Sequence, residues 1–291
     1  MTAAQSHARS VRMVSVMCCD VRLLMRILGA DASLRRLVLR QSRAVVFASG
    51  MKFKSRYVRA LKLGARKALD YLSPDYRLGL QSYSQSGEDL VLWDFYQDFS
   101  RVNYKGSYVD VGCHHPFRFS NTCIFYQAGW SGLNIDPDRR AIAEFKRFRP
   151  RDINLEMAVS DKSEPVVFNV FNDGAINSLD AHLAEARDGQ HDWKIMEKRT
   201  LTPRTLASIL DEHWEAGRVI DFLDVDVEGF DYEVLVSNDW SKYRPRFVLV
   251  EDDPELGLAR ASESRIHGLL AGVGYKLVAA TLRTRIFENG K

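Results

Sequence analysis

The fold is decided by the stretch YVDVG at residues 108–112, in which a short apolar run ends in a carboxylate and then a glycine. Such a run is typical of a buried strand that leads into a tight turn. A second run, GLNIDP at residues 132–137, follows at a distance that fits a turn, one helix and the next strand. The two runs therefore predict neighbouring strands whose carboxyl ends carry Asp110 and Asp136.

Outward from these strands, short apolar runs alternate with amphipathic stretches between residue 81 and the C-terminus. Helices are predicted at 87–99, 121–128, 139–148, 205–215, 232–237 and 262–271. Strands are predicted at 108–111, 132–135, 154–159, 219–225 and 247–250, with hairpins at 166–171 and at 275–287. Residues 172–200 show little periodicity and are predicted to form a lid. The alternation indicates an α/β fold, a doubly wound, mostly parallel seven-stranded Rossmann-like sheet with an antiparallel edge hairpin.

The composition is that of a globular protein: the chain has 291 residues, of which 46% are hydrophobic and 27% charged. Its four cysteines form no CxxC pair and no metal-spaced cluster, which disfavours a disulfide framework or a zinc module. No apolar run reaches the roughly 18 residues that a membrane span needs, and the N-terminus lacks the order of a cleaved leader. We expect a soluble, cytoplasmic protein.

Charge divides the chain into two parts. The first 80 residues hold 16 Lys and Arg against 4 Asp and Glu, whereas the rest holds 25 against 34. This predicts a basic, partly helical extension at 1–80, followed by a domain at 81–291. Residues 51–72 have the pattern of a basic amphipathic helix, which fits a packed or solvated helix as well as a peripheral membrane contact. Residues 1–50 are uninformative, and Met51 is an alternative start of the native sequence. We expect no nucleic-acid partner.

Acidic residues end four of the predicted strands. They are Asp110, Asp136, Asp224 with Asp226 and Glu228, and Glu251 with Asp252. Ligands of open α/β sheets bind beyond the carboxyl ends of the strands, so this set indicates a ligand with hydroxyls, an amine or positive charge, or a metal. A carboxylate in the position of Asp136 can accept both hydroxyls of a ribose. The turn at 112–117 lacks two glycines of the dinucleotide motif, so a nucleoside without phosphates fits better.

Over about residues 82–250, the sequence resembles the FkbM-type methyltransferases, a family of class I S-adenosylmethionine-dependent enzymes. The matching blocks are SQSGED (84–89), VDVGCHHP (109–116), SNT (120–122), GWSGLNIDP (129–137), RPRDIN (149–154) and DVDVEG (224–229). Their order and spacing carry the resemblance. Other members have Ala-Asn or Ala-His after the glycine, where this chain has Cys113 and His114.

The resemblance implies that S-adenosylmethionine is the cofactor. Asp110 and Gly112 would lie against its amino-acid end, Asp136 would bind the ribose diol, and residues 157–161 would edge the adenine. The implied cofactor-binding residues are Asp110, Gly112, His114, Asn121, Asp136, Ala158, Val159 and Asp226. The catalytic candidates are Asp226, Glu228 and His115, because an acceptor hydroxyl needs a base nearby. A magnesium ion, with Glu251 and Asp252 as further ligands, is the alternative means of stabilising the acceptor oxygen.

The resulting hypothesis is O-methylation of a hydroxyl on a sugar or another polar metabolite, with a small molecule or a glycan as acceptor. Two alternatives stay open. Asp224-Val225-Asp226 is also the D-x-D pattern of metal-dependent glycosyltransferases, and its two carboxylates would lie on one side of a strand. A non-catalytic binding module with the same fold is the other alternative, which the intact Asp110, Gly112 and Asp136 disfavour.

Overall fold

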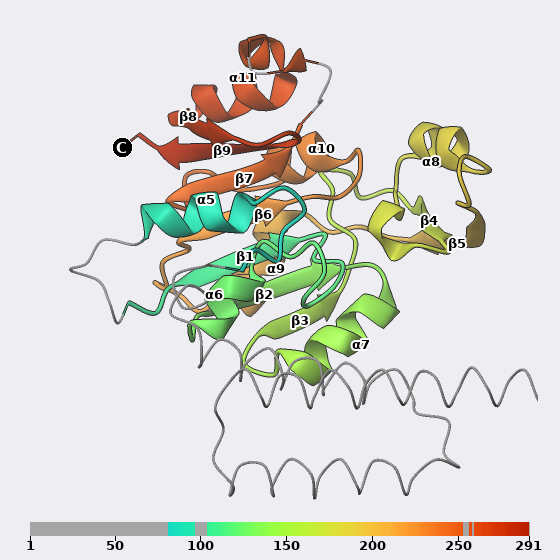
Figure 1. The fold of residues 1–291 in the computed structure, drawn as a ribbon, viewed down its shortest axis with the longest axis horizontal. Helices are drawn as coiled ribbons and strands as arrows, with labels where there is room; N and C mark the ends of the chain where they lie inside the picture. Colours follow the sequence, from blue (N-terminus) through green and yellow to red (C-terminus); the bar gives the residue numbers. More distant parts are fainter. Residues whose placement is uncertain (1–80, 97–103, 253–255, 258, 291) are drawn as a thin grey trace, which may run out of the picture. The chain divides into compact units, whose positions relative to one another are not determined.

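The computed structural model describes residues 81–96, 104–252, 256–257 and 259–290 (Figure 1), and all of them belong to one unit, Leu80–Lys291. The predicted basic extension, including the helix at 51–72, lies outside the described residues. In the described part, no helix is both long enough and apolar enough to cross a membrane.

A seven-stranded sheet formed by described residues is the centre of this unit (Figure 1). Its order is β3-β2-β1-β6-β7-β9-β8; β1, β2, β3, β6 and β7 pair in parallel, and β9 pairs antiparallel with both β7 and β8. The strands are β1 (Ser107–Val111), β2 (Ser131–Asp136), β3 (Ile153–Glu156), β6 (Phe222–Val225), β7 (Phe247–Glu251), β8 (Tyr275–Ala280) and β9 (Thr284–Asn289). This confirms the predicted doubly wound sheet with its antiparallel edge hairpin.

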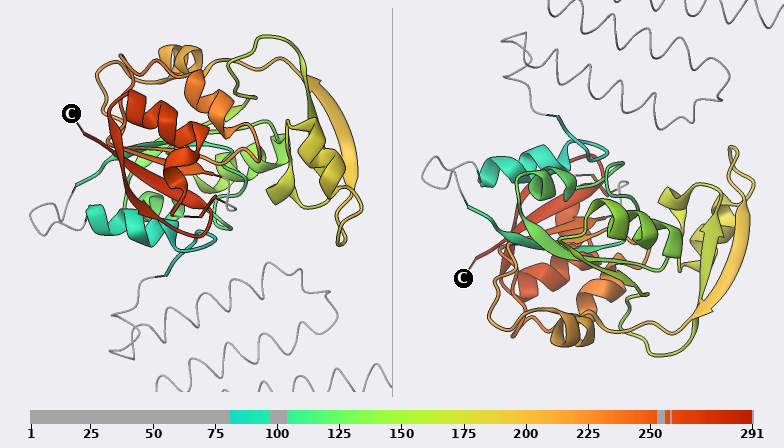
Figure 2. Two further views of the ribbon diagram at one scale, coloured as in Figure 1. Left: turned by 90° about the horizontal axis from the view of Figure 1, so that it is seen from above. Right: turned by 90° about the horizontal axis from the view of Figure 1, so that it is seen from below.

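Helices cover both faces of the sheet (Figure 2). On one face lie α5 (Glu88–Phe95), α6 (Cys123–Gln127) and α7 (Arg139–Phe148), and on the other lie α9 (Leu206–His213), α10 (Asp231–Val236) and α11 (Arg265–Gly272), which η4 (Ala261–Glu263) precedes. Alternation along β1 supplies both cores. Val109 and Val111 belong to the aliphatic core with α9, α10 and α11, whereas Tyr108 belongs to an aromatic core with Phe125 and Phe222.

The structure corrects the prediction for residues 166–200. Instead of a hairpin, residues 166–171 form one strand, β4 (Val166–Phe171), which pairs antiparallel with β5 (Ile195–Leu201). Between the two strands lie η2 (Gly174–Ile176) and α8 (Ala181–Arg187), so the segment 172–200 is not irregular. The hairpin prediction was wrong because β5 reads IMEKRTL and has no fully buried residue. Its half-buried side includes the charged residues Glu197 and Arg199, so no apolar alternation marks it as a strand.

Residues 166–201 form a small lobe that lies beyond the carboxyl ends of the parallel strands (Figures 1 and 2). Contacts at two separate strand ends help to attach it to the sheet. On the β6 side, the Ser178 hydroxyl donates to the Glu228 carbonyl oxygen (2.6 Å), and Arg187 Nη2 pairs with Glu228 Oε2 (2.6 Å). On the β2 side, Arg199 Nη1 donates to the Pro137 carbonyl oxygen (3.0 Å). The lobe is therefore fixed at two separate strand ends.

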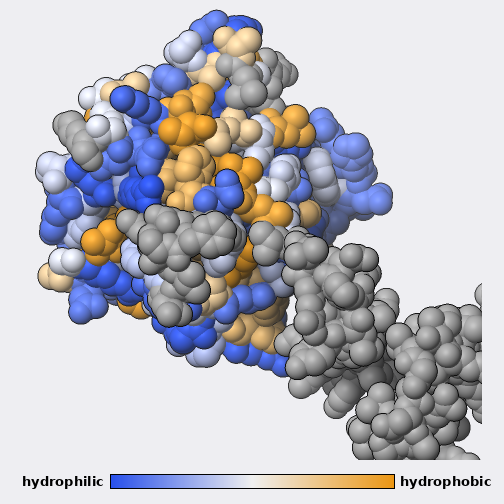
Figure 3. Space-filling model, turned by 60° about the vertical axis from the view of Figure 1, so that its left-hand side comes forward, coloured by the Kyte–Doolittle hydropathy of each residue, from blue (hydrophilic) through white to orange (hydrophobic). Residues whose placement is uncertain are grey.

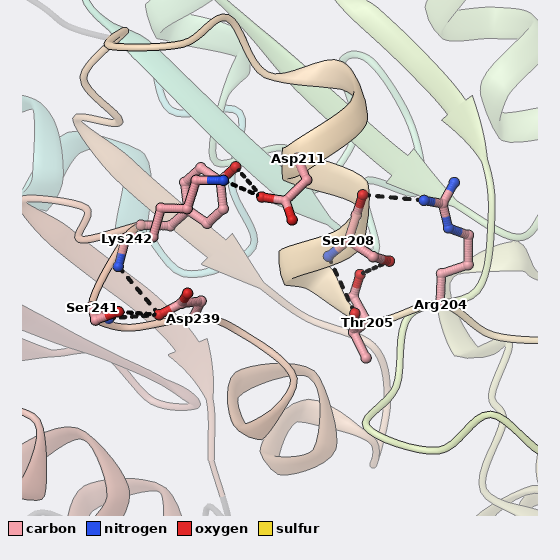
Figure 4. A network of polar contacts seen from close by, with 8 residues as sticks. Arg204, Thr205, Ser208, Asp211, Asp239, Ser241 and Lys242 are labelled. Carbon is pink, nitrogen blue, oxygen red and sulfur yellow. Dashed lines mark hydrogen bonds and ion pairs between the residues drawn. The ribbon is translucent and has the colours of Figure 1, made fainter.

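The polar contacts around α9 are structural (Figure 4). Thr205 caps the helix, because its hydroxyl accepts the N–H of Ser208 (3.2 Å). Further along the helix, Asp211 accepts from Lys242 Nζ (2.5 Å) and from the Tyr243 hydroxyl (2.7 Å). Exposed pairs of this kind add little to stability, and their role is to fix the helix against the loop at 239–243.

Some apolar residues reach the surface of the domain. Figure 3, which brings the left-hand side of Figure 1 forward, shows them in the middle of that face with hydrophilic residues around them. The most exposed large apolar side chains are Leu282 (76%), Val219 (66%) and Met196 (65%). These three residues belong to different parts of the fold, and single exposed apolar residues are normal on a folded domain.

Candidate functional site

A cavity of about 310 Å³ lies where the small lobe faces the ends of the parallel strands. Its sheet side contains residues that follow β1, β2, β3 and β6, and its lobe side contains apolar, polar and charged residues of 168–193. The volume is at the lower end of the range of small-molecule sites. The lining includes Gly112, His114, Asp136, Met157, Ala158, Val159, Arg187, Trp193, Asp226, Glu228 and Arg283.

Gly112 follows β1 and lies on the cavity wall, where the backbone after β1 approaches the backbone after β6. Its φ of +86° suits glycine, and a Cβ there would lie 1.8 Å from the carbonyl oxygen of Asp226. The Asp226 N–H in turn donates to the Val111 carbonyl oxygen (3.0 Å). The glycine is therefore needed first of all for the close approach of two backbone segments, and this approach brings Asp226 to the cavity wall.

Asp136 ends β2 as a buried carboxylate on the cavity wall. It accepts two backbone N–H groups, from His114 (2.9 Å) and from Asp138 (2.7 Å). Burial raises the pKa of Asp136 to about 7, although these two hydrogen bonds act in the opposite direction. Each carboxylate oxygen keeps a lone pair for a further donor. A ligand with two adjacent hydroxyls would donate to these lone pairs and stabilise the charged form of the carboxylate.

The two neighbouring histidines have different positions. His114 lines the cavity with a φ of +49°, and burial lowers its pKa to about 4, so its ring is neutral at pH 7. Its Nε2 is buried and has no hydrogen-bond partner within the described structure. His115 stabilises the next turn, where its Nδ1 accepts the N–H groups of Phe117 (3.1 Å) and Arg118 (3.0 Å). The described residues on the cavity wall do not include His115.

Asp110 and Asn121 support the loop that follows β1. The Asp110 side chain lies on the face of β1 opposite Val111, where it accepts the Thr122 hydroxyl (2.7 Å), and burial raises its pKa to about 6. Asn121 Nδ2 donates to Asp224 Oδ1 (3.1 Å). The described residues that line the cavity include neither Asp110 nor Asn121. Strand alternation thus turns the Asp110 side chain away from the cavity, and Asn121 binds Asp224 instead of lining the cavity.

Three carboxylates meet at the β6 and β7 end of the cavity. One oxygen each of Asp226, Glu228 and Glu251 lies within 4.8 Å of the other two. Arg187 pairs with Glu228 (2.6 Å), and Arg283 pairs with Glu251 (3.6 Å). Although Asp226 is exposed at the cavity, desolvation by the surrounding protein and the negative charges of Glu251 and Glu228 raise its pKa well above the usual range. The cluster therefore tends to hold a proton.

The predicted magnesium site needs a correction. Asp252 is not part of the carboxylate cluster, because it forms a buried ion pair with Arg285 (2.7 Å) and accepts the Ser264 hydroxyl (2.8 Å). The guanidinium groups of Arg187 and Arg283 already offset charge in the remaining cluster. These contacts do not support a magnesium site, and we assign no metal ion to the cluster.

The cavity also contains residues that the sequence did not single out. They are Gln85, Arg118, Asp173, Arg187, Trp193 and Arg283. Gln85 falls in the SQSGED block, which was a usable signal. Arg187 and Trp193 fall in the segment 172–200, which has no periodic pattern that would place them. Arg118 and Asp173 form a two-pronged ion pair (3.0 and 3.1 Å) that connects the loop after β1 to the small lobe.

The comparisons with known proteins agree with this arrangement. No curated protein matches the chain. The family model described as the methyltransferase FkbM domain matches residues 110–277, which is more than half of the chain and includes Asp110, Asp136 and Asp226. The suspected resemblance is thereby confirmed, and the chain belongs to the FkbM methyltransferase family.

Proposed function

We propose that this domain transfers a methyl group from S-adenosylmethionine to a hydroxyl of a sugar or another polar metabolite. The observation that carries the proposal is the order of groups along the cavity: apolar residues after β3, the buried carboxylate of Asp136 after β2, and the open carboxylate of Asp226 after β6. This order suits an adenosine at one end and a reacting centre at the other.

The β3 and β2 side of the cavity fits a nucleoside. Met157, Ala158 and Val159 offer apolar contact for an adenine, and the Met157 N–H donates to the Asp136 carbonyl oxygen (3.2 Å), which ties this segment to the ribose site. Asp136 would accept the two ribose hydroxyls at its carboxylate. Phosphates fit poorly, because Asp226 and Glu228 would repel them on the other side.

The geometry favours methyl transfer over the glycosyltransferase alternative. A D-x-D site needs both of its carboxylates at the ligand. Here Asp226 lines the cavity, whereas Asp224 is buried and hydrogen-bonded to Asn121. The two carboxylates therefore do not converge on one site.

The chain's own residues can supply the proton chemistry. When bound, S-adenosylmethionine supplies an electrophilic methyl group on a positively charged sulfur. In its ionised form, Asp226 would orient the acceptor hydroxyl and take its proton at a carboxylate oxygen as the methyl group passes from sulfur to the acceptor oxygen and S-adenosylhomocysteine is released. The raised pKa makes the ionised carboxylate a stronger base than an ordinary one. Glu228 would share this proton load, because its pKa is raised by burial and by Glu251 as well.

The small lobe would exclude water from the reacting atoms. Phe168, Leu179 and Trp193 form part of the lobe side of the cavity, and the Arg118–Asp173 ion pair connects the lobe to the loop after β1. Exclusion of water strengthens the electrostatic contacts of the site and holds the acceptor in line with the methyl group. The mixture of carboxylate and guanidinium groups on the wall supports a hydroxylated acceptor, since both groups hydrogen-bond hydroxyls.

Calorimetry separates this proposal from its alternatives. We expect the full chain to bind S-adenosylmethionine and S-adenosylhomocysteine but not a sugar nucleotide such as UDP-glucose. Incubation with methyl-labelled S-adenosylmethionine and panels of glycans and polar metabolites should then give a product that carries the label on oxygen. Tight binding of the sugar nucleotide, with no heat from the adenosyl ligands, would overturn the proposal.

A further inference from the structure

A buried carboxylate fixes the loop that precedes α5. Asp89, which is fully buried, accepts the hydroxyls of Ser82 (2.7 Å) and Ser84 (2.8 Å). It also accepts the N–H of Tyr83 (2.7 Å). Gln85 follows directly, is exposed, and lines the cavity. Within the described structure, no group hydrogen-bonds the Gln85 amide, so a rigid loop presents one unpaired amide to the cavity.

Two contacts show at which end of the cavity Gln85 lies. The carbonyl oxygen of Tyr83 accepts the N–H of Ser120, in the loop after β1 (3.0 Å). Glu88 Oε1 accepts the hydroxyl of Thr281, in the turn between β8 and β9 (2.6 Å). The sheet order is β3-β2-β1-β6-β7-β9, and Asp136 ends β2. The loop that carries Gln85 therefore contacts segments that lie beyond Asp136 as seen from β3. Gln85 is therefore at the end of the cavity opposite the apolar residues after β3.

This end of the cavity contains both negatively and positively charged groups. The carboxylates of Asp226, Glu228 and Glu251 meet here, and the guanidinium of Arg283 pairs with Glu251. Such carboxylates attract an ammonium group but repel a carboxylate. A ligand with an α-amino acid at this end needs a hydrogen-bond donor for its carboxylate, and a primary amide offers two N–H donors without adding a charge.

We propose that Gln85 binds the amino-acid end of the cofactor by donating from its Nε2 amide to the methionine carboxylate. The inference rests on the proposed function, since that function places a methionine group beyond the ribose. It adds a cofactor-binding residue on the loop before α5, outside the matched stretch 110–277. The hydrogen bonds of Asp89 would contribute to binding, because a donor that is already held in place loses less conformational entropy when the ligand binds.

The test compares three ligands of the full-length chain by calorimetry. S-adenosylmethionine and S-adenosylhomocysteine carry the amino-acid end, and 5′-methylthioadenosine keeps the adenosine and the sulfur but lacks that end. The variants are Gln85→Ala, Gln85→Glu and a matched control, Gln81→Ala, which removes an exposed glutamine four positions earlier that is not part of the described cavity wall.

We expect Gln85→Ala to weaken both amino-acid-bearing ligands about tenfold, and to leave 5′-methylthioadenosine unchanged. Gln85→Glu should weaken them further, because a carboxylate then faces a carboxylate. Gln81→Ala should match the wild type with all three ligands. Retained affinity for 5′-methylthioadenosine shows that the Gln85 variants are folded.

Equal affinities of Gln85→Ala and the wild type for S-adenosylmethionine would overturn the inference and leave the proposed function standing. An equal loss with all three ligands would overturn it too, because the effect would then not concern the amino-acid end. A wild type that binds none of the three would contradict the proposed function itself.

Discussion

Replacing Asp136 by Asn should have opposite effects on stability and on cofactor binding at neutral pH. Burial raises the pKa of Asp136 from 3.8 to about 7, so the folded state holds its proton over a range in which the unfolded chain has lost it. Raising the pH from about 4 to about 7 therefore lowers the stability of the wild type. The raised pKa lowers the free energy of unfolding by about 4 kcal/mol above pH 7, but by less than about 1 kcal/mol at pH 4.

Asparagine carries no charge, so it removes this loss of stability. It introduces another loss, which does not depend on pH. The two carboxylate oxygens of Asp136 accept one N–H each, from Asp138 and from His114. An amide has one acceptor oxygen, so one of these buried N–H groups would lose its partner, at a cost of about 1–3 kcal/mol. Asp136→Asn should thus be less stable than the wild type at pH 4 and more stable at pH 8.

Thermal and urea unfolding across pH 4–8 would measure this reversal, and calorimetry at pH 7.5 would measure binding. Loss of charged hydrogen bonds to the ribose should weaken S-adenosylmethionine by about 1.5–3 kcal/mol, or about 10- to 150-fold. Asp180→Asn is the matched control, since Asp180 caps α8 and asparagine caps equally well. Parallel stability curves for Asp136→Asn and the wild type would show that Asp136 does not titrate as described, and unchanged affinity would show that it does not bind the ribose.

Three further predictions concern one glycine and two aspartates. Gly112→Ala should prevent folding or destabilise the domain by about 3 kcal/mol or more, because its Cβ would overlap the Asp226 carbonyl oxygen; an unchanged melting temperature would speak against that contact. Asp226→Asn should lower kcat about 100-fold or more while the affinity for S-adenosylmethionine changes little, and equal losses in both would point to a binding role instead. Asp252→Asn should destabilise the fold by about 3–5 kcal/mol, because it leaves Arg285 buried without its ion pair, and chemical unfolding that shows no change would contradict this.

The centre of the sheet could be predicted from the sequence because β1, β2, β6 and β7 are buried on both faces. β7 reads FVLVE, with a polar residue only at its end, and β1 and β6 are short apolar runs that contain one aspartate each next to their last residue. The positions of Asp136 and Asp226 follow from the ends of β2 and β6. β5 could not be recognised in the same way, because it belongs to a two-stranded sheet whose inner side is only half-buried. Strand prediction succeeded where burial left a strong pattern.

The direction of single side chains was harder to predict than the position of the strands. Asp110 and Val111 are neighbours at the end of β1, yet one supports Thr122 and the other lines the cavity. Arg187 reaches the site from the small lobe, whose position depends on tertiary contacts such as its own pairing with Glu228. Alternation along β1 could have separated the first two residues, whereas no local pattern places Arg187.

The central claim is that Asp136 and the residues after β3 bind a phosphate-free adenosine. A crystal structure with S-adenosylhomocysteine at saturating concentration tests it most directly. We expect both ribose hydroxyls within hydrogen-bond distance of the Asp136 carboxylate and the adenine against Ala158 and Val159. An adenosyl group bound elsewhere, or a cavity that stays empty at that concentration, would contradict it.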